Sequence, residues 1–252
     1  MITLLSPAKS LDFTTNFNCK NHSNHCFKKE TLELISKLKK LNIQDLEKLM
    51  DISKKLAELN FNRFEDFSKD FNLKNSRQAL LAFDGDVYDG IEKNNFDEND
   101  FSFAQNHLRI LSGLYGVLKP LDLIQAYRLE MGLDFKKLNF DFKNLYQFWG
   151  DKISLSLDSL NSSYIINLAS NEYFLVINPK KIRAKIINVA FKEEKNGKLK
   201  IVGINVKKAR GVMANFIIKN KITNPQDLKK FNQLGYKFVD KLSDPLNFIF
   251  IK

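Results

Sequence analysis

The chain has 252 residues, of which 44% are hydrophobic and 27% charged, a composition typical of a folded globular protein with a substantial core. No apolar run approaches the ~18 residues that a membrane-spanning helix needs, and two cysteines are too few for a disulfide framework. The N-terminus also lacks the basic start and the long apolar run of a signal peptide, so we expect a cytoplasmic protein.

The formal net charge is +11, but the charged residues are distributed unevenly. Residues 178–252 contain 18 Lys and Arg against five Asp and Glu, whereas residues 1–177 contain 22 against 24. The excess of positive charge therefore falls in the last third of the chain. This asymmetry favours an anionic partner such as a nucleotide or the phosphate backbone of nucleic acid. A generally basic surface is the alternative explanation.

The first predicted element is a short buried strand over residues 2–5. Pro7 cannot donate a hydrogen bond to a neighbouring strand, so the strand must end before it. Ser6 and Lys9 would then lie at the carboxyl end of this strand.

Both cysteines and two of the three histidines fall within eight residues. Thiolate and imidazole are good zinc ligands, so Cys19, His22, His25 and Cys26 form a candidate metal cluster. Their spacing differs from the usual zinc signatures, which have two separated ligand pairs, and the neighbours His25 and Cys26 would reach one metal with difficulty. We therefore assign no metal site and no cofactor, and leave open whether this cluster binds a metal.

Residues 28–67 form a predicted helical segment, with apolar residues at helical spacing. Ser53 is a good N-cap, which puts Lys54 and Lys55 in the first turn of a helix, where a bound phosphate would offset their unfavourable interaction with the helix dipole. Two short helices around a tight turn resemble a helix-hairpin-helix, which binds the DNA backbone, although the usual hairpin glycine is missing. An ordinary pair of helices is the alternative.

The middle of the chain contains an acidic turn, a helix and a candidate strand. The acidic spacing of residues 84–90 hints at calcium, but Tyr88 stands where a ligand belongs, so we interpret this segment as a turn or a cleft wall. Residues 101–111 have helical spacing. Arg128 and Glu130 alternate with apolar neighbours, so in a strand they would share one face.

The last third of the chain contains further predicted strands. Residues 164–168 form a second buried strand, and residues 185–191 and 199–206 form a hairpin around the Asn-Gly turn at 196–197. Helical spacing then follows Gly211.

The strands beginning at residues 2, 164 and 199 end in the sequences S-P-A-K, S-N-E-Y and K-K-A-R. If these carboxyl ends meet, they assemble a basic cleft. Glu172 in that cleft is a candidate general base, although a buried ion pair is the commoner role for such a carboxylate. The predicted DNA- or phosphate-binding cations are Lys9, Lys54, Lys55, Arg77, Arg128, Lys207, Lys208 and Arg210, and the predicted cleft-lining residues are Ser6, Tyr115, Ser170 and Tyr173.

Six segments of this sequence carry a likeness to a known family. They are LLSPAKSLDF (4–13), RQALLAFDGDVYDG (77–90), LRILSGLYGVLKPLDLIQAYRLEMG (108–132), LYQFWGD (145–151), INLASNEYF (166–174) and KKARGVMANFII (207–218). In these segments, and in their order along the chain, the sequence resembles the YaaA family. The resemblance runs essentially from end to end, over residues 1–252.

The resemblance implies a mixed α/β (α+β) fold in a single domain, with a central mixed β-sheet, flanking helices, a positively charged cleft and a helix-hairpin-helix. It also implies a cytosolic bacterial protein that protects against hydrogen peroxide by limiting free intracellular iron, and that binds DNA. The missing hairpin glycine and the Cys/His cluster depart from the family pattern. Six of the predicted cations lie in the matching segments, namely Lys9, Arg77, Arg128, Lys207, Lys208 and Arg210.

Two hypotheses for the function remain open. The sequence has no evident haem ligand pair, ferritin-like Glu-x-x-His pair or peroxidatic cysteine setting, so we do not expect direct iron storage or peroxide reduction. One hypothesis is a protein that binds duplex or junction DNA without sequence preference and shields it under oxidative stress. The other is an enzyme that acts on a nucleic-acid base or a nucleotide, with the cleft as its active site. We expect a monomer with no membrane association.

Overall fold

The centre of the fold is the short strand β1 (Ile2–Leu5), all four residues of which are buried. It pairs in parallel with β5 (Leu108–Ser112) on one side and with β8 (Tyr164–Asn167) on the other. A strand with parallel neighbours and two covered faces is a nearly continuous apolar run, as this segment is. The computed structural model describes residues 1–17, 19–138 and 140–252.

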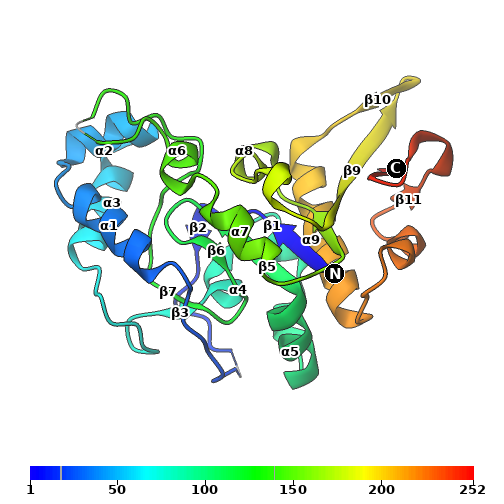
Figure 1. The fold of residues 1–252 in the computed structure, drawn as a ribbon, viewed down its shortest axis with the longest axis horizontal. Coiled ribbons are helices and arrows are strands. Elements are labelled where there is room, and N and C mark those ends of the chain that lie inside the picture. The colour runs from blue at the N-terminus through cyan, green and yellow to red at the C-terminus, as the bar shows by residue number, and fades with distance from the viewer. Residues whose placement is uncertain (18, 139) are drawn as a thin grey trace.

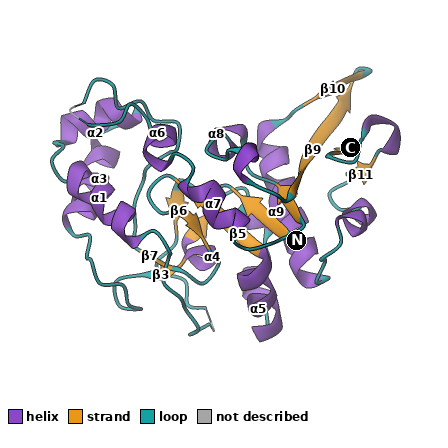
Figure 2. Cartoon of the chain, viewed as in Figure 1, coloured by secondary structure: helices purple, strands orange, loops and turns teal. Residues whose placement is uncertain are grey.

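These strands belong to an eight-stranded sheet in the order β11-β12-β9-β8-β1-β5-β6, with β10 paired to β9. Figure 2 draws the strands in orange. The β8–β9 and β9–β12 pairs are also parallel, whereas β5–β6, β9–β10 and β11–β12 are antiparallel. The predicted mixed α/β fold with a central mixed sheet is therefore confirmed. The remaining strands of this sheet are β6 (Gly116–Leu118), β9 (Lys185–Lys195), β10 (Lys198–Lys200), β11 (Lys237–Phe238) and β12 (Asn247–Ile251).

Two small antiparallel pairs lie outside the main sheet. They are β2 (Ser10–Leu11) with β4 (Phe83–Asp84), and β3 (Arg77–Gln78) with β7 (Leu123–Ile124). The first pair joins the segment that follows β1 to the acidic turn at residues 84–90, and this connection shapes the site described below.

Helices α5 and α9 contact each other and the main sheet, and α8 contacts β5. No helix among the described residues is long and apolar enough to cross a membrane. The helices are α1 (Lys28–Leu38), α2 (Ile43–Met50), α3 (Lys54–Glu65), α4 (Ala79–Ala82), α5 (Glu98–His107), α6 (Leu145–Trp149), α7 (Lys152–Asp158), α8 (Asn171–Phe174) and α9 (Gly203–Lys219). Short 3-10 helices are η1 (Tyr88–Gly90), η2 (Lys93–Asn95), η3 (Pro179–Lys181), η4 (Pro225–Lys230) and η5 (Asp240–Leu242).

The helical segment predicted at residues 28–67 forms α1, α2 and α3, which gather at one end of the molecule (Figure 1, left). Asn42 and Asp45 form a reciprocal capping box at the start of α2. Asp51 ends α2 in the left-handed conformation, at φ 48°, where glycine is the usual residue. The chain thus makes the tight turn between α2 and α3 without a glycine.

The hairpin predicted around residues 196–197 is confirmed, because Asn196 and Gly197 have φ angles of 54° and 69° between β9 and β10. Its second strand was predicted to run to residue 206, and this extent is wrong. β10 ends at Lys200, and α9 begins at Gly203. The alternation that indicated a strand is misleading, because Ile204 is 63% exposed while the buried residues follow a helical period.

The helix predicted over residues 101–111 is partly wrong as well. α5 ends at His107, and Leu108 begins the strand β5, which pairs directly with β1. Every residue of β5 is buried. A fully buried strand has no alternating polar face, so its apolar run reads as a continuation of the preceding helix.

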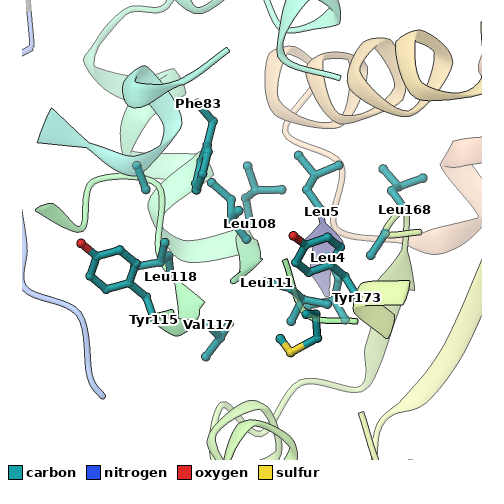
Figure 3. Packing of buried hydrophobic residues seen from close by; sticks show 14 of the residues in the cluster. Leu4, Leu5, Phe83, Leu108, Leu111, Tyr115, Val117, Leu118, Leu168 and Tyr173 are labelled. Carbon is teal, nitrogen blue, oxygen red and sulfur yellow. The ribbon is translucent and has the colours of Figure 1, made fainter. Parts of the chain in front are cut away.

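The hydrophobic core surrounds the central strands. Figure 3 shows Leu4 and Leu5 of β1 close to Leu111 of β5, with Tyr173 of α8 packed beside them. All four side chains are buried. The carboxyl end of β1 and the start of α8 are therefore held together by shared apolar contacts.

Candidate functional site

A pocket of about 500 Å³ lies where β1 and β8 end side by side. Both strands run in the same direction, with Leu4 opposite Asn167, so the segments that follow them leave the sheet at the same edge. We call this cavity the strand-end pocket. It is lined by Ser6, Pro7, Ala8, Lys9, Ser10, Asp84, Gly85, Asp86, Val87, Glu130, Leu168, Ser170, Glu172, Tyr173, Lys207 and Arg210.

Hydrogen bonds tie the two strand ends together at the base of the strand-end pocket. The Ser170 backbone N–H donates to Oγ of Ser6 at 2.8 Å, and the Ser6 hydroxyl donates to Oγ of Ser170 at 3.2 Å. The buried Tyr88 hydroxyl donates to the Ser6 carbonyl at 2.9 Å. The structure thus brings Ser6 and Ser170 together at the two strand ends.

Glu130 joins two cations at one wall of the strand-end pocket. Its Oε1 accepts from Nε of Arg128 at 3.0 Å and lies 2.9 Å from Nη2 of the same side chain. Nζ of Lys9 approaches the same oxygen at 3.3 Å. The second oxygen, Oε2, is buried and has no hydrogen-bond partner among the described residues. This carboxylate thus has one crowded oxygen and one unsatisfied oxygen.

Helix α9 supplies the cations of the opposite wall. Nζ of Lys207 lies 3.2 Å from Oδ2 of Asp86. Arg210, one turn further on, makes no ion pair with any described residue, and its Nε is buried without a partner. Burial lowers the pKa of the Arg210 guanidinium, which nevertheless stays charged at neutral pH. Arg210 therefore brings an uncompensated positive charge to the strand-end pocket.

Two glycines fix the acidic turn against α9. A Cβ on Gly211 would lie 1.7 Å from the Val87 carbonyl oxygen, and one on Gly90 would lie 2.7 Å from the Lys208 carbonyl oxygen. The backbones of α9 and η1 therefore touch directly, which only glycine permits at these two positions. Gly211 was expected to precede a helix, but it lies inside α9, where it holds Val87 next to Arg210.

Glu172 and Tyr173 project from the start of α8. Oε1 of Glu172 accepts a hydrogen bond from the Gly132 backbone N–H at 3.1 Å, and the side chain is exposed. Burial raises the pKa of Tyr173 well above its ordinary value, so its phenol stays protonated. Glu172 thus lines the strand-end pocket, and within the described part of the chain it makes none of the buried ion pairs that were the alternative to a general base.

The charge of the strand-end pocket is mixed rather than uniformly positive. Its cationic lining residues are Lys9, Lys207 and Arg210, and its acidic ones are Asp84, Asp86, Glu130 and Glu172. Two of the cations have a carboxylate within 3.3 Å, so among the described residues the lining charges without an ion-pair partner are the cation Arg210 and the carboxylates Asp84 and Glu172. Of the two interpretations of the acidic turn, a turn or a cleft wall, the structure favours the second, since its first residues line the pocket.

Several predicted site residues lie elsewhere. Arg77 donates to the carbonyls of Asp12 and Thr15 and so fixes the loop after β2. Tyr115 is fully buried, and its hydroxyl accepts from the Gln125 backbone N–H, so its assignment to the cleft lining is wrong. An aromatic residue between two glycines looks like a loop residue in the sequence, but here it belongs to the core.

The other predicted cations surround the strand-end pocket or lie apart from it. Arg128 approaches it only through Glu130, and Lys208 is an exposed residue of α9 that is not part of the lining. Lys54 and Lys55 are exposed at the start of α3, in the helical region. Glu130 was not among the predicted site residues, although it pairs with its sequence neighbour Arg128, because its contact with Lys9 joins segments far apart in the sequence.

The Cys/His cluster does not assemble into a metal site among the described residues. His25 is buried with its ring against Phe71 and Tyr115, at centroid distances of 4.7 and 4.9 Å. Burial lowers its pKa to about 4. His22, in contrast, is exposed and bonds only to the Lys20 carbonyl, at 3.1 Å. His25 therefore acts as a packing residue.

Comparison with known proteins gives consistent matches over the whole chain. A family model described as "Peroxide stress protein YaaA" matches residues 1–242. A "UPF0246 protein" of Acaryochloris marina is 46% identical over 258 residues, covering 100% of both chains. "UPF0246 protein" relatives of Polynucleobacter asymbioticus and Saccharophagus degradans are 49% and 47% identical, and cover 94% and 100% of this chain and 93% and 99% of their own. The chain therefore belongs to the YaaA family of peroxide stress proteins.

Proposed function

We propose that the chain protects the cell in peroxide stress by limiting intracellular free iron and oxidative damage to DNA, and that it binds DNA. Family membership supports the role in peroxide stress. The unpaired cation Arg210 at the strand-end pocket is the observation that favours a phosphorylated partner. A second contact lies on the α2–α3 helix pair, where Lys54 and Lys55 are exposed. We propose that this pair acts as a helix-hairpin-helix.

The N-terminus of α3 has three features that suit a DNA phosphate. It has Lys54 and Lys55 but no acidic residue in its first turn, and the Ser53 side chain makes no capping hydrogen bond. Its first backbone N–H groups, the helix dipole and two ammonium groups therefore all favour an anion. α1 also begins with two lysines but has Glu30 in its first turn, whereas the carboxylate nearest the α3 lysines is Glu58, one turn further on, with Oε1 4.0 Å from Nζ of Lys54.

Duplex binding as a function of salt tests this proposal. Fluorescence anisotropy of a labelled duplex would be measured at several salt concentrations for the wild type and for the double variant Lys54→Ala/Lys55→Ala. Each lost phosphate contact reduces the slope of log affinity against log salt by about one, so we expect a reduction of about two. Lys28→Ala/Lys29→Ala, which removes the lysine pair of α1, is the matched control and keeps the slope.

The shielding part of the proposal has its own readout. Duplex DNA exposed to Fe(II) and hydrogen peroxide should be nicked less in the presence of the wild type than in the presence of Lys54→Ala/Lys55→Ala. In cells, loss of the protein should raise the chelatable iron pool. Duplex affinity that stays constant as salt increases would remove DNA backbone binding from the proposal.

An enzyme acting on a nucleotide is the second candidate function. It is favoured by the exposed carboxylate of Glu172, which lines the strand-end pocket and is held by the Gly132 N–H. A carboxylate with a free oxygen at the carboxyl ends of parallel strands is suited to general-base chemistry. A Glu172→Gln protein that folds and binds DNA but does not protect cells from peroxide would support this candidate.

A further inference from the structure

Two charged groups of the strand-end pocket lack the partners that buried charges normally have. Glu130 is 92% buried, because its exposed fraction is 8%, and its Oε2 has no partner among the described residues. Arg210 has no ion-pair partner there, and its Nε is buried without a hydrogen bond. Leaving such groups unsatisfied costs stability, and a native protein normally does so where a ligand or water completes them.

The two groups differ in what they can bind. Arg210 offers only donors and a positive charge, so its complement is an anion with oxygen acceptors, such as a phosphate. A carboxylate oxygen accepts hydrogen bonds, and Oε1 of Glu130 already contacts both Arg128 and Lys9, so Oε2 is the oxygen left to accept from a ligand. Its complement is an N–H or O–H donor. A ligand that satisfies both therefore has an anionic group and a separate hydrogen-bond donor.

The dimensions and neutral groups of the strand-end pocket narrow the ligand further. A volume of about 500 Å³ lies in the range for one small molecule and is far too small for a duplex. The lining includes the partly exposed Pro7, Ala8 and Val87, which offer apolar surface for a flat ring, and the neutral phenol of Tyr173. These features suit a heterocyclic base attached to a phosphate.

We propose that the strand-end pocket binds one nucleoside monophosphate unit, with the phosphate at Arg210 and an N–H of the base donating to Oε2 of Glu130. This proposal rests on the proposed function, because it names the part of a phosphorylated partner that the same pocket binds. The unit is either a free nucleotide or a nucleotide extruded from a DNA strand. Extrusion carries an unstacking cost, which is smallest for unpaired nucleotides.

Calorimetric titration of the purified protein tests the ligand chemistry. The probes are the four deoxynucleoside 5′-monophosphates, the corresponding deoxynucleosides and inorganic phosphate. We expect at least one monophosphate to bind roughly tenfold or more tightly than its nucleoside and than phosphate, since each end contributes a hydrogen bond to a charged group. A nucleoside or phosphate that binds as tightly as every monophosphate would overturn the proposal.

Two substitutions assign the two ends separately. Arg210→Gln should weaken both monophosphate and phosphate binding by roughly tenfold or more, whereas Glu130→Gln should weaken only the monophosphate, because an amide N–H₂ replaces the acceptor. Arg183→Gln and Glu33→Gln make the same chemical changes at exposed positions away from the pocket and should bind like the wild type. If Glu130→Gln weakens phosphate equally, the assignment of the base to Glu130 is wrong.

The remaining controls distinguish loss of binding from loss of folding, and a free nucleotide from a nucleotide of DNA. Should Glu130→Gln unfold, the comparison of monophosphate with nucleoside on the wild type still decides the question. If the bound unit comes from DNA, a duplex with one bulged nucleotide should compete with the monophosphate, and a fully paired duplex should not. If neither duplex competes, the pocket binds free nucleotides. Monophosphate binding without duplex binding would refute the proposed DNA role alone, and the reverse would refute the nucleotide site alone.

Discussion

The contact between α9 and η1 gives the sharpest prediction, made through Gly211→Ala. In an isolated helix this substitution would be favourable, by about 1 kcal/mol, because alanine has the higher helix propensity. In this structure the new Cβ would lie 1.7 Å from the Val87 carbonyl oxygen and 2.8 Å from the Val87 carbonyl carbon. Both atoms belong to the backbone, so no side-chain rotation relieves the overlap.

The magnitude follows from comparing these two effects. Overpacking a well-packed contact costs about 1–3 kcal/mol, and more when backbone must move. Because a tolerated contact starts near 3.0 Å, η1 and α9 would have to separate by more than an ångström. We therefore expect the net loss to reach about 2 kcal/mol or more, which lowers the melting temperature by about 4–8 °C in a domain of this size.

Thermal unfolding followed by circular dichroism measures this loss. Gly203→Ala is the matched control, because Gly203 is the first residue of the same helix and an added Cβ there would meet nothing within 4 Å. We expect Gly203→Ala to melt at or slightly above the wild-type temperature. If Gly211→Ala is as stable as Gly203→Ala, the direct backbone contact between α9 and η1 does not exist, and Val87 is not held beside Arg210 as described.

Three further predictions concern other regions of the chain. Lys54→Ala/Lys55→Ala should leave the melting temperature within about 1 °C of the wild type while it reduces duplex affinity, because both side chains are exposed; an equal loss in affinity and in stability would point to misfolding instead. Glu172→Gln replaces a charged acceptor of the Gly132 N–H by a neutral one, so the free energy of unfolding should fall by about 1 kcal/mol at most at this exposed site. If the carboxylate is a general base, the same variant should lose protection in a peroxide-survival assay; full protection would exclude that role. Burial lowers the pKa of His25 to about 4, so this imidazole binds a proton more readily in the unfolded chain than in the folded one. The free energy of unfolding, measured with urea, should therefore fall by up to about 3 kcal/mol as the pH is lowered from about 6.5 to about 4. A His25→Phe variant should lose this pH dependence, whereas His22→Gln should keep it, since His22 is exposed; identical pH profiles for all three proteins would contradict the burial of His25.

The predicted meeting of two strand ends succeeded for a physical reason. β1 and β8 are short buried strands followed by serine, and parallel neighbours necessarily end at one edge of the sheet. Ser6 and Ser170 could therefore be placed together from the sequence, along with Lys9, Glu172 and Tyr173. Their mutual hydrogen bonds depend on register, which a sequence pattern does not specify.

The cations on the third side of the strand-end pocket were predicted to follow a strand, but they lie on a helix. Lys207 and Arg210 do line the pocket, but from the side of α9 rather than from the end of a strand. Over a few residues, a segment rich in β-branched residues followed by lysines fits both the two-residue period of a strand and the 3.6-residue period of a helix. The burial of Val206 and Met213 follows the helical period. The alternation of Arg128 and Glu130 predicted that they share a face, but not that Glu130 also pairs with Lys9, which comes from a distant segment and brings Glu130 to the pocket.

The position of β1 has a consequence for the order in which the protein folds during synthesis. The central strand of the sheet leaves the ribosome before any of its neighbours, and β8, which borders it, follows some 160 residues later. Its apolar side chains therefore have no strand partner until β5 emerges at residue 108, and they lack the second partner until β8 emerges at residue 164, a period in which ribosome-associated chaperones can protect them.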